Sequence, residues 1–182
     1  MKSKLRGFTL IETMIVLSII GLIIPVMFSL FFINLRSQTK VLILQEVKRN
    51  GDNSLNTIES LSKQFGVSFH QASPPLRTNE VCVTTGSNYS AGNIYILDES
   101  GDWFSFYLDN GRIASESGTT GVTYLTNDKV VVSSFSLTCD RPISVSPPIM
   151  SISFTVSQVG TPGRQEEEAS LNYQTKIKLR SY

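Results

Sequence analysis

An uncharged stretch near the start of the chain sets the strongest limit on how it can fold. From Thr13 to Ile33 the sequence runs for 21 residues without a charged side chain. An α-helix rises about 1.5 Å per residue, so a run of this length covers about 30 Å, the thickness of the hydrocarbon core of a bilayer. We therefore expect a helix that crosses a membrane.

A short basic leader precedes this run. It contains Lys2, Lys4 and Arg6, and no acidic residue lies before Glu12. Because positive charges stay on the cytoplasmic side, we predict a single-pass protein with a cytoplasmic amino terminus and an extracytoplasmic remainder. A secretory signal peptide starts similarly, but its apolar part is only about 7–15 residues long and ends near a small-residue cleavage site. The first alanine here is Ala72, which argues against such a signal and leaves an uncleaved signal anchor open.

The leader and the apolar run meet in a motif. Residues 6–12 read Arg-Gly-Phe-Thr-Leu-Ile-Glu. Together with the flanking segments, this motif resembles the class III signal of type IV pilins and type II secretion pseudopilins. The resemblance covers roughly the first thirty residues. It implies that the leader 1–7 is removed by a prepilin peptidase cutting between Gly7 and Phe8, that the new amino group of Phe8 is methylated, and that Glu12 serves assembly.

The position of Glu12 has a physical cost of its own. A carboxylate within a membrane-spanning segment is unfavourable unless it finds a partner. The next basic residue is Arg36, too far along the helix to reach, so we expect the partner to come from elsewhere. The resemblance implies the free amino group of Phe8 on a neighbouring subunit. The alternative is that Glu12 lies at the level of the lipid headgroups and is simply solvated.

Helical periodicity continues beyond the membrane. We predict one nearly continuous helix from Phe8 to Phe65, with a transmembrane or filament-core half (8–35) and an amphipathic half (36–66). The amphipathic half should pack one apolar stripe into a core. That stripe comprises Leu44, Val47, Gly51, Leu55, Ile58, Leu61 and Phe65.

Three residues are expected to interrupt or end this helix. Gly21 and Pro25 predict a kink, because proline removes a backbone donor and clashes with the preceding turn. Transmembrane helices also tolerate both residues, so a bend without function stays open. Gly66 is expected to end the helix as a left-handed C-cap.

The remaining segment, 67–182, is expected to form a β-rich extracytoplasmic head. Asp109-Asn110-Gly111 predicts a two-residue hairpin turn of the primed type. An antiparallel sheet laid against the helical stripe gives an α+β fold, with a long helical stem and a pilin-like head. The expected strands are 80–85, 93–97, 103–108, 129–137, 149–156 and 170–180.

The head contains two cysteines, Cys82 and Cys139. An even number of cysteines in an oxidising compartment favours a disulfide. Closing a loop of this size stabilises by about 4 kcal/mol in the chain-entropy model. Two buried reduced thiols are the alternative.

We find no pattern typical of an enzyme. His70 is the only histidine, so no zinc set can form around histidines, and nucleophile elbows, phosphate loops and dinucleotide fingerprints are absent. The acidic run 166–168 lacks calcium-loop spacing and is interpreted as a solvated turn. We expect no cofactor, no metal and no catalytic residue.

Two surface features could suggest ligands. The aromatic residues Trp103, Phe104, Phe106 and Tyr107 are interpreted as core and cross-strand packing, with a sugar- or partner-binding patch as the alternative. The net charge is +1, and Lys176, Lys178 and Arg180 form only one short ladder. A nucleic-acid partner is therefore not expected.

The sequence is interpreted as a pilin-like structural subunit. The resemblance implies three kinds of partner: other pilin subunits, the prepilin peptidase and an inner-membrane assembly platform. It implies a location in the membrane and then in a pilus or pseudopilus, serving secretion, adhesion, motility or DNA uptake. The alternatives are a monomeric membrane-anchored binding module that never polymerises, and an exported enzyme, which lacks an acid–base or nucleophile set.

Overall fold

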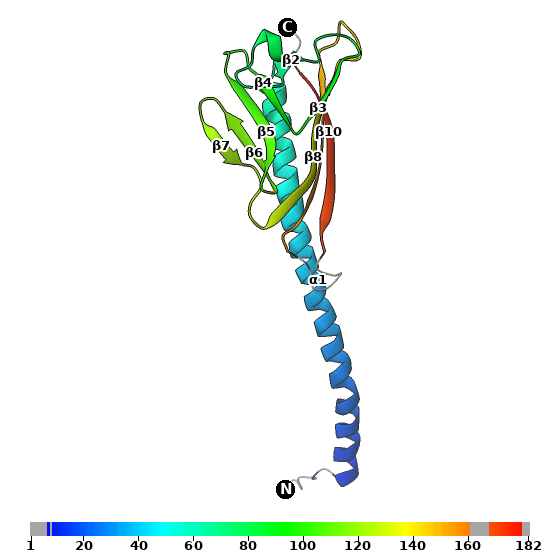
Figure 1. Ribbon diagram of the computed structural model, residues 1–182. Coiled ribbons are helices and arrows are strands. Elements are labelled where there is room, and N and C mark those ends of the chain that lie inside the picture. Colours follow the sequence, from blue (N-terminus) through cyan, green and yellow to red (C-terminus); the bar gives the residue numbers. More distant parts are fainter. Residues whose placement is uncertain (1–6, 8, 161–167, 180–182) are drawn as a thin grey trace, which may run out of the picture.

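The computed structural model describes residues 7, 9–160 and 168–179. Its one long helix, α1, spans Leu10–Phe65 over 56 residues. The first part of α1 projects from the head as a stem, and the second part lies between two β-sheets (Figure 1). The α+β pilin-like architecture expected from the sequence is confirmed.

The two ends of α1 are fixed by different residues. Thr9 is the N-cap. At the other end the prediction of a left-handed C-cap is wrong, because Gly66 is extended, with φ −71° and ψ 125°. The chain leaves the helix directly into a strand, and the N–H of Val67 donates to Leu97 O at 2.9 Å. A Cβ at position 66 would lie 2.6 Å from Ser62 O and 2.8 Å from Leu179 Cδ2. Glycine is therefore needed at position 66 for close approach rather than for its φ angle.

The first sheet has six antiparallel strands in the order β2-β1-β4-β5-β6-β7. The strands are β1 (Ser68–His70), β2 (Glu80–Val81), β4 (Asn93–Leu97), β5 (Trp103–Asp109), β6 (Arg112–Ser117) and β7 (Gly121–Tyr124). A short 3₁₀-helix, Arg77–Asn79, precedes β2. The predicted hairpin turn is confirmed, since Asp109 pairs with Arg112 and the two residues between them have positive φ.

The second sheet has four antiparallel strands in the order β10-β9-β8-β3. They are β3 (Asn88–Ala91), β8 (Val130–Asp140), β9 (Ile149–Gln158) and β10 (Ser170–Lys178). The predicted alternation along β10 is confirmed, with Ile177 buried and Lys176 and Lys178 exposed. Arg180, the predicted end of this strand, lies outside the described residues.

The sequence-based strand predictions failed in two ways. A single sheet was expected and two are present, with α1 between them. The expected strand 80–85 is only Glu80–Val81, and β1, β3 and β7 were not anticipated. The unanticipated strands have three or four residues each, so they are too short to show a clear alternation of apolar side chains.

The buried face of α1 differs from the predicted stripe. Leu44 and Phe65 are 41% and 43% exposed. The residues that the helix buries are Val47, Asn50, Gly51, Ser54, Ile58 and Ser62. Four of these six residues, Asn50, Gly51, Ser54 and Ser62, are small or polar, which lets the strands approach the helix closely there. Both sheets and the helix share one apolar core, which includes Ile58, Phe106 and Ile152.

The four aromatic residues of β5 divide between its two faces. Phe106 is fully buried, and Phe104 packs against the core, as predicted. Trp103 and Tyr107 alternate with them and point outward. Trp103 is half-buried and makes an edge-to-face contact with Tyr95, with ring centroids 5.3 Å apart. The two phenylalanines therefore pack in or against the core, and the contact of Trp103 with Tyr95 on the neighbouring strand β4 is the cross-strand packing that the sequence predicted.

Candidate functional site

The amino-terminal end of α1 is closed by a capping box between Thr9 and Glu12. The Thr9 N–H donates to Glu12 Oε2 at 2.8 Å, and the Thr9 hydroxyl donates to the same oxygen at 2.9 Å. The Glu12 N–H donates back to Thr9 Oγ1 at 3.4 Å. This reciprocal pattern satisfies backbone donors that the first helical turn leaves free. The Glu12 side chain is therefore held against the end of its own helix.

The capping box corrects one step of the sequence analysis. The Glu12 carboxylate was expected to find no partner within the chain, yet Thr9 supplies two hydrogen bonds. The Thr-x-x-Glu spacing before an apolar run is the signal that could have predicted it. No described residue forms an ion pair with Glu12, because the one ion pair among the described residues joins Lys63 and Glu59. The hydrogen bonds of Glu12 are accounted for, whereas its charge has no cationic partner in the described chain.

The other residues of the motif are placed only in part. Gly7 is exposed, and a Cβ built on it would meet no atom within 4 Å. The structure therefore sets no steric demand for glycine at position 7. Phe8 lies outside the described residues, as do the leader residues Lys2, Lys4 and Arg6. Cleavage, methylation and the leader charge stay predictions.

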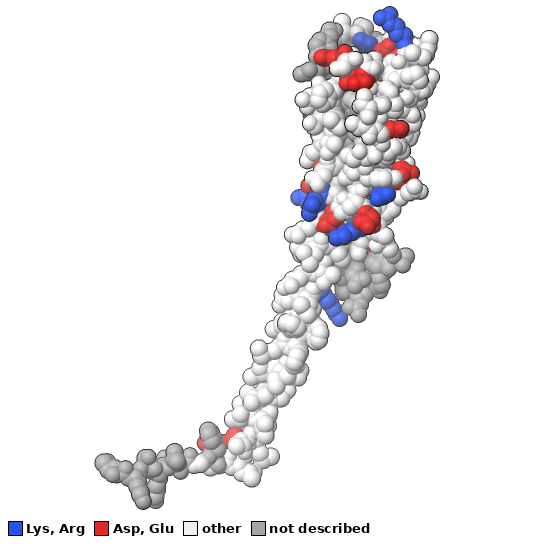
Figure 2. Space-filling model, turned by 90° about the vertical axis from the view of Figure 1, so that its left-hand side faces the viewer, with Lys and Arg blue, Asp and Glu red and all other residues white. Residues whose placement is uncertain are grey.

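The stem is exposed on every side, and from Thr13 to Ile33 it carries no charged side chain. All described residues from 9 to 42 are exposed, and α1 is long and apolar enough to cross a membrane. Figure 2 shows a stem whose middle is uncharged, with acidic atoms only near its lower end and basic atoms only near the head, beneath a head that carries charges of both signs. The helix runs without interruption through Gly21 and Pro25, so the kink stays a prediction. A soluble monomer could not leave such a surface in water, and this finding fits a membrane anchor.

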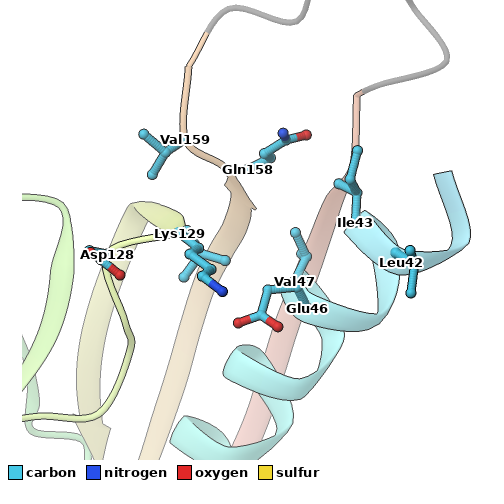
Figure 3. A pocket seen from close by; sticks show the side chains of 9 residues that line it. Leu42, Ile43, Glu46, Val47, Asp128, Lys129, Gln158 and Val159 are labelled. Atoms are coloured by element: carbon cyan, nitrogen blue, oxygen red, sulfur yellow. The ribbon is translucent and has the colours of Figure 1, made fainter. Parts of the chain in front are cut away.

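A pocket of about 590 Å³ lies where the stem enters the head (Figure 3). It opens between α1, the start of β8 and the end of β9. Its lining is mixed, with apolar side chains around two acids and one lysine. The lining residues are Leu42, Ile43, Glu46, Val47, Asp128, Lys129, Val130, Gln158 and Val159. Within it, the Glu46 carboxylate and the Lys129 ammonium point toward one another (Figure 3).

A polar network fixes the wall of this pocket, and sequence reasoning missed it. Asn127 Nδ2 donates to Glu46 Oε1 at 2.6 Å, and the Asn127 N–H donates to Asn50 Oδ1 at 3.0 Å. Asn50 Nδ2 donates to Glu46 Oε1 at 3.1 Å. The hydrogen bond from Asn127 is the main cause of a lowered Glu46 pKa, to which Asn50 and the charges of Lys129 and Arg49 add. The available sequence signal was the position of Asn50, three residues after Val47 of the predicted apolar stripe.

The two cysteines and the histidine have structural roles. Cys82 and Cys139 form a disulfide, with their Cα atoms 6.2 Å apart, which confirms the predicted bridge. Cys82 follows β2 and Cys139 lies in β8, so the bond links the two sheets. His70 is buried and hydrogen-bonds to Ser68 Oγ, Leu76 O and Asn79 Oδ1. Within the described ranges no three His, Cys, Asp or Glu residues gather as a metal site requires.

Comparison with known families identifies the amino-terminal segment. Residues 2–24 match the model of the prokaryotic N-terminal methylation motif. Comparisons with curated proteins and with solved structures give no match to the chain. The matched region covers the leader, the capping box and the start of the exposed stem. The chain therefore carries the class III signal of type IV pilins at the start of a pilin-like α+β fold, and this motif supports a type IV pilin-like precursor.

Proposed function

We propose that the chain is a structural subunit of a type IV pilus or a type II secretion pseudopilus. A prepilin peptidase cuts its precursor between Gly7 and Phe8 and methylates Phe8. The mature chain stays in the membrane through α1, with its head extracytoplasmic, until an inner-membrane platform adds it to a filament of pilin subunits. It has no enzymatic activity. The observation that carries this proposal is a helix that starts within the methylation motif, is exposed and mostly apolar along its first part, and continues into a folded head.

Glu12 provides the register for assembly in this proposal. Its carboxylate is oriented by Thr9 but keeps an unpaired charge in an apolar setting, which is unfavourable in a membrane. The amino group of Phe8 on an incoming subunit neutralises it. Phe8 and Glu12 are four residues apart, so this pairing staggers the two parallel stems by about 6 Å.

The capping box allows the charge of Glu12 to be tested apart from its hydrogen bonds. Glu12→Gln keeps a side chain that can complete a capping box but removes the charge. Glu12→Ala removes both. We expect both variants to insert into the membrane and neither to enter filaments, as measured by sedimentation of assemblies after gentle detergent extraction from the native cells.

Two outcomes would count against the proposal. Wild-type assembly of Glu12→Gln would mean that capping alone matters and that no neighbouring amino group is required. Wild-type protein that is found only as single copies would favour the monomeric membrane-anchored module. Thr9→Val is the matched control, because it weakens the capping box and leaves the charge in place; we expect it to assemble.

A further inference from the structure

The pocket at the base of the head includes the carboxylate of Asp128, which contributes no described contact to the fold. Among the described residues, none forms a hydrogen bond or an ion pair with Asp128, which is exposed at the mouth of the pocket. Glu46 and Asp128 outnumber Lys129, so the pocket lining has a net charge of −1. Its other walls include the apolar side chains of Leu42, Val130 and Val159. The pocket therefore fits an apolar segment that carries a positive charge.

The exposed stem provides a segment with this chemistry. Between Glu12 and Glu46 the only charged residues are Arg36 and Lys40. Both are exposed, and no described residue pairs with either. The neighbouring positions include Ile33, Leu35 and Leu42, which are exposed apolar side chains. Segment 33–42 thus combines apolar side chains with two free cations.

We propose that the pocket receives segment 33–42 of a second copy of this chain, with Lys40 of that copy beside Asp128. The inference rests on the proposed function, because it needs two parallel stems side by side. It adds to that function a second contact between neighbouring subunits, at the opposite end of the stem from Glu12.

The spacing along the helix supports the same neighbour for both contacts. Asn127 bonds to Glu46 and Asn50, so the adjacent Asp128 lies near the level of Glu46. Lys40 is six residues below Glu46, which is about 9 Å along the axis. A copy whose amino group reaches Glu12 is already shifted toward the head by about 6 Å. The shifts have the same direction and differ by about 3 Å, which a flexible lysine side chain can span.

Cysteine cross-linking tests this contact in the full-length protein. The two native cysteines are bonded to each other, so introduced cysteines react without competition from described free thiols. We would express Lys40→Cys/Asp128→Cys in native cells, oxidise the membranes and separate the chains without reductant. We expect dimers and higher multiples of the chain, in which mass spectrometry identifies position 40 of one copy joined to position 128 of another.

The controls separate this contact from random collision. Lys40→Cys/Val145→Cys keeps the stem thiol and moves the second one to a loop beyond the far end of β8, where Val145 is 88% exposed. We expect at least tenfold fewer cross-links from this variant. Adding Glu12→Gln to Lys40→Cys/Asp128→Cys should abolish the cross-link along with assembly.

The outcomes also distinguish this inference from the proposed function. Normal sedimentable assemblies without a 40–128 cross-link would overturn the pocket contact and leave the proposed function standing. A cross-link to a different protein would overturn the choice of a second copy as occupant. If the wild-type chain formed no assemblies and the variant formed neither assemblies nor cross-links, the proposed function would itself fail.

Discussion

At the scale of single residues, Gly51 shows how closely the helix and β10 pack. A Cβ at this position would lie 2.1 Å from Tyr173 Cε2. The Tyr173 ring stacks on Phe154, with centroids 5.2 Å apart, and its hydroxyl donates to Lys48 O at 3.1 Å. The ring therefore crosses the helix at the one buried position without a side chain.

Replacing Gly51 should weaken the fold. In Gly51→Ala the added methyl group displaces the Tyr173 ring from Phe154 and breaks its hydrogen bond to Lys48 O. Overpacking of this kind costs about 1–3 kcal/mol of folding free energy. We expect a lower free energy of unfolding for the full-length chain in detergent, measured by denaturant titration. Gly21→Ala is the matched control, since a Cβ there meets no atom within 4 Å. Equal stability of the two variants would contradict the packing described here.

Tyr173 should also make stability depend on alkaline pH. Burial of its ring, and then the nearby Asp52 carboxylate, raise the pKa of Tyr173 from 10.0 to about 12. The folded state thus holds this proton more tightly than the unfolded chain. Its contribution to stability is complete below pH 10 and is lost as the pH rises through 12. Tyr173→Phe should remove part of this dependence, measured as the unfolding midpoint against pH; an unchanged profile would refute it.

At the scale of elements, the sequence predicted long periodic segments well and close packing poorly. The helix end at Phe65, strand β4 and the Asn110-Gly111 turn were found because each has a strong local signal. The true buried face of α1 was missed because it includes Asn50 and Ser54, whose side chains bond to the preceding helical turn and also to Asn127 and Leu125, far along the chain. Such distant partners depend on the tertiary fold, so the periodicity of the sequence does not reveal them.

Asn50 illustrates this dependence and can be tested. It is 6% exposed and accepts the Asn127 N–H. Asn50→Ala leaves that N–H and the Glu46 carboxylate short of a partner, which costs about 1–3 kcal/mol. We expect a matching loss in unfolding free energy and faster hydrogen exchange at Asn127. Asn53→Ala, on the exposed side of the same helix, should change neither, and similar effects from both variants would contradict the network.

At the scale of the whole molecule, one helix joins two environments. Its first part is exposed among the described residues and suits lipid or neighbouring stems, while its second part is the centre of a core between two sheets. The Cys82–Cys139 bond ties those sheets together. The head and the stem share one helix. When a neighbouring subunit displaces the stem along its axis, the head therefore moves by the same distance. The two proposed assembly contacts, at Glu12 and at the pocket, would therefore be mechanically linked.

The most direct measurement is the amino-terminal sequence of the protein extracted from its native membranes. We expect N-methylated phenylalanine, derived from Phe8, followed by Thr-Leu-Ile-Glu. A Gly7→Leu variant should retain the leader, because the peptidase must fit a small side chain there. The structure gives glycine no folding role at that position, so misfolding would not explain the result. Wild-type protein that still begins at Met1 would contradict the account.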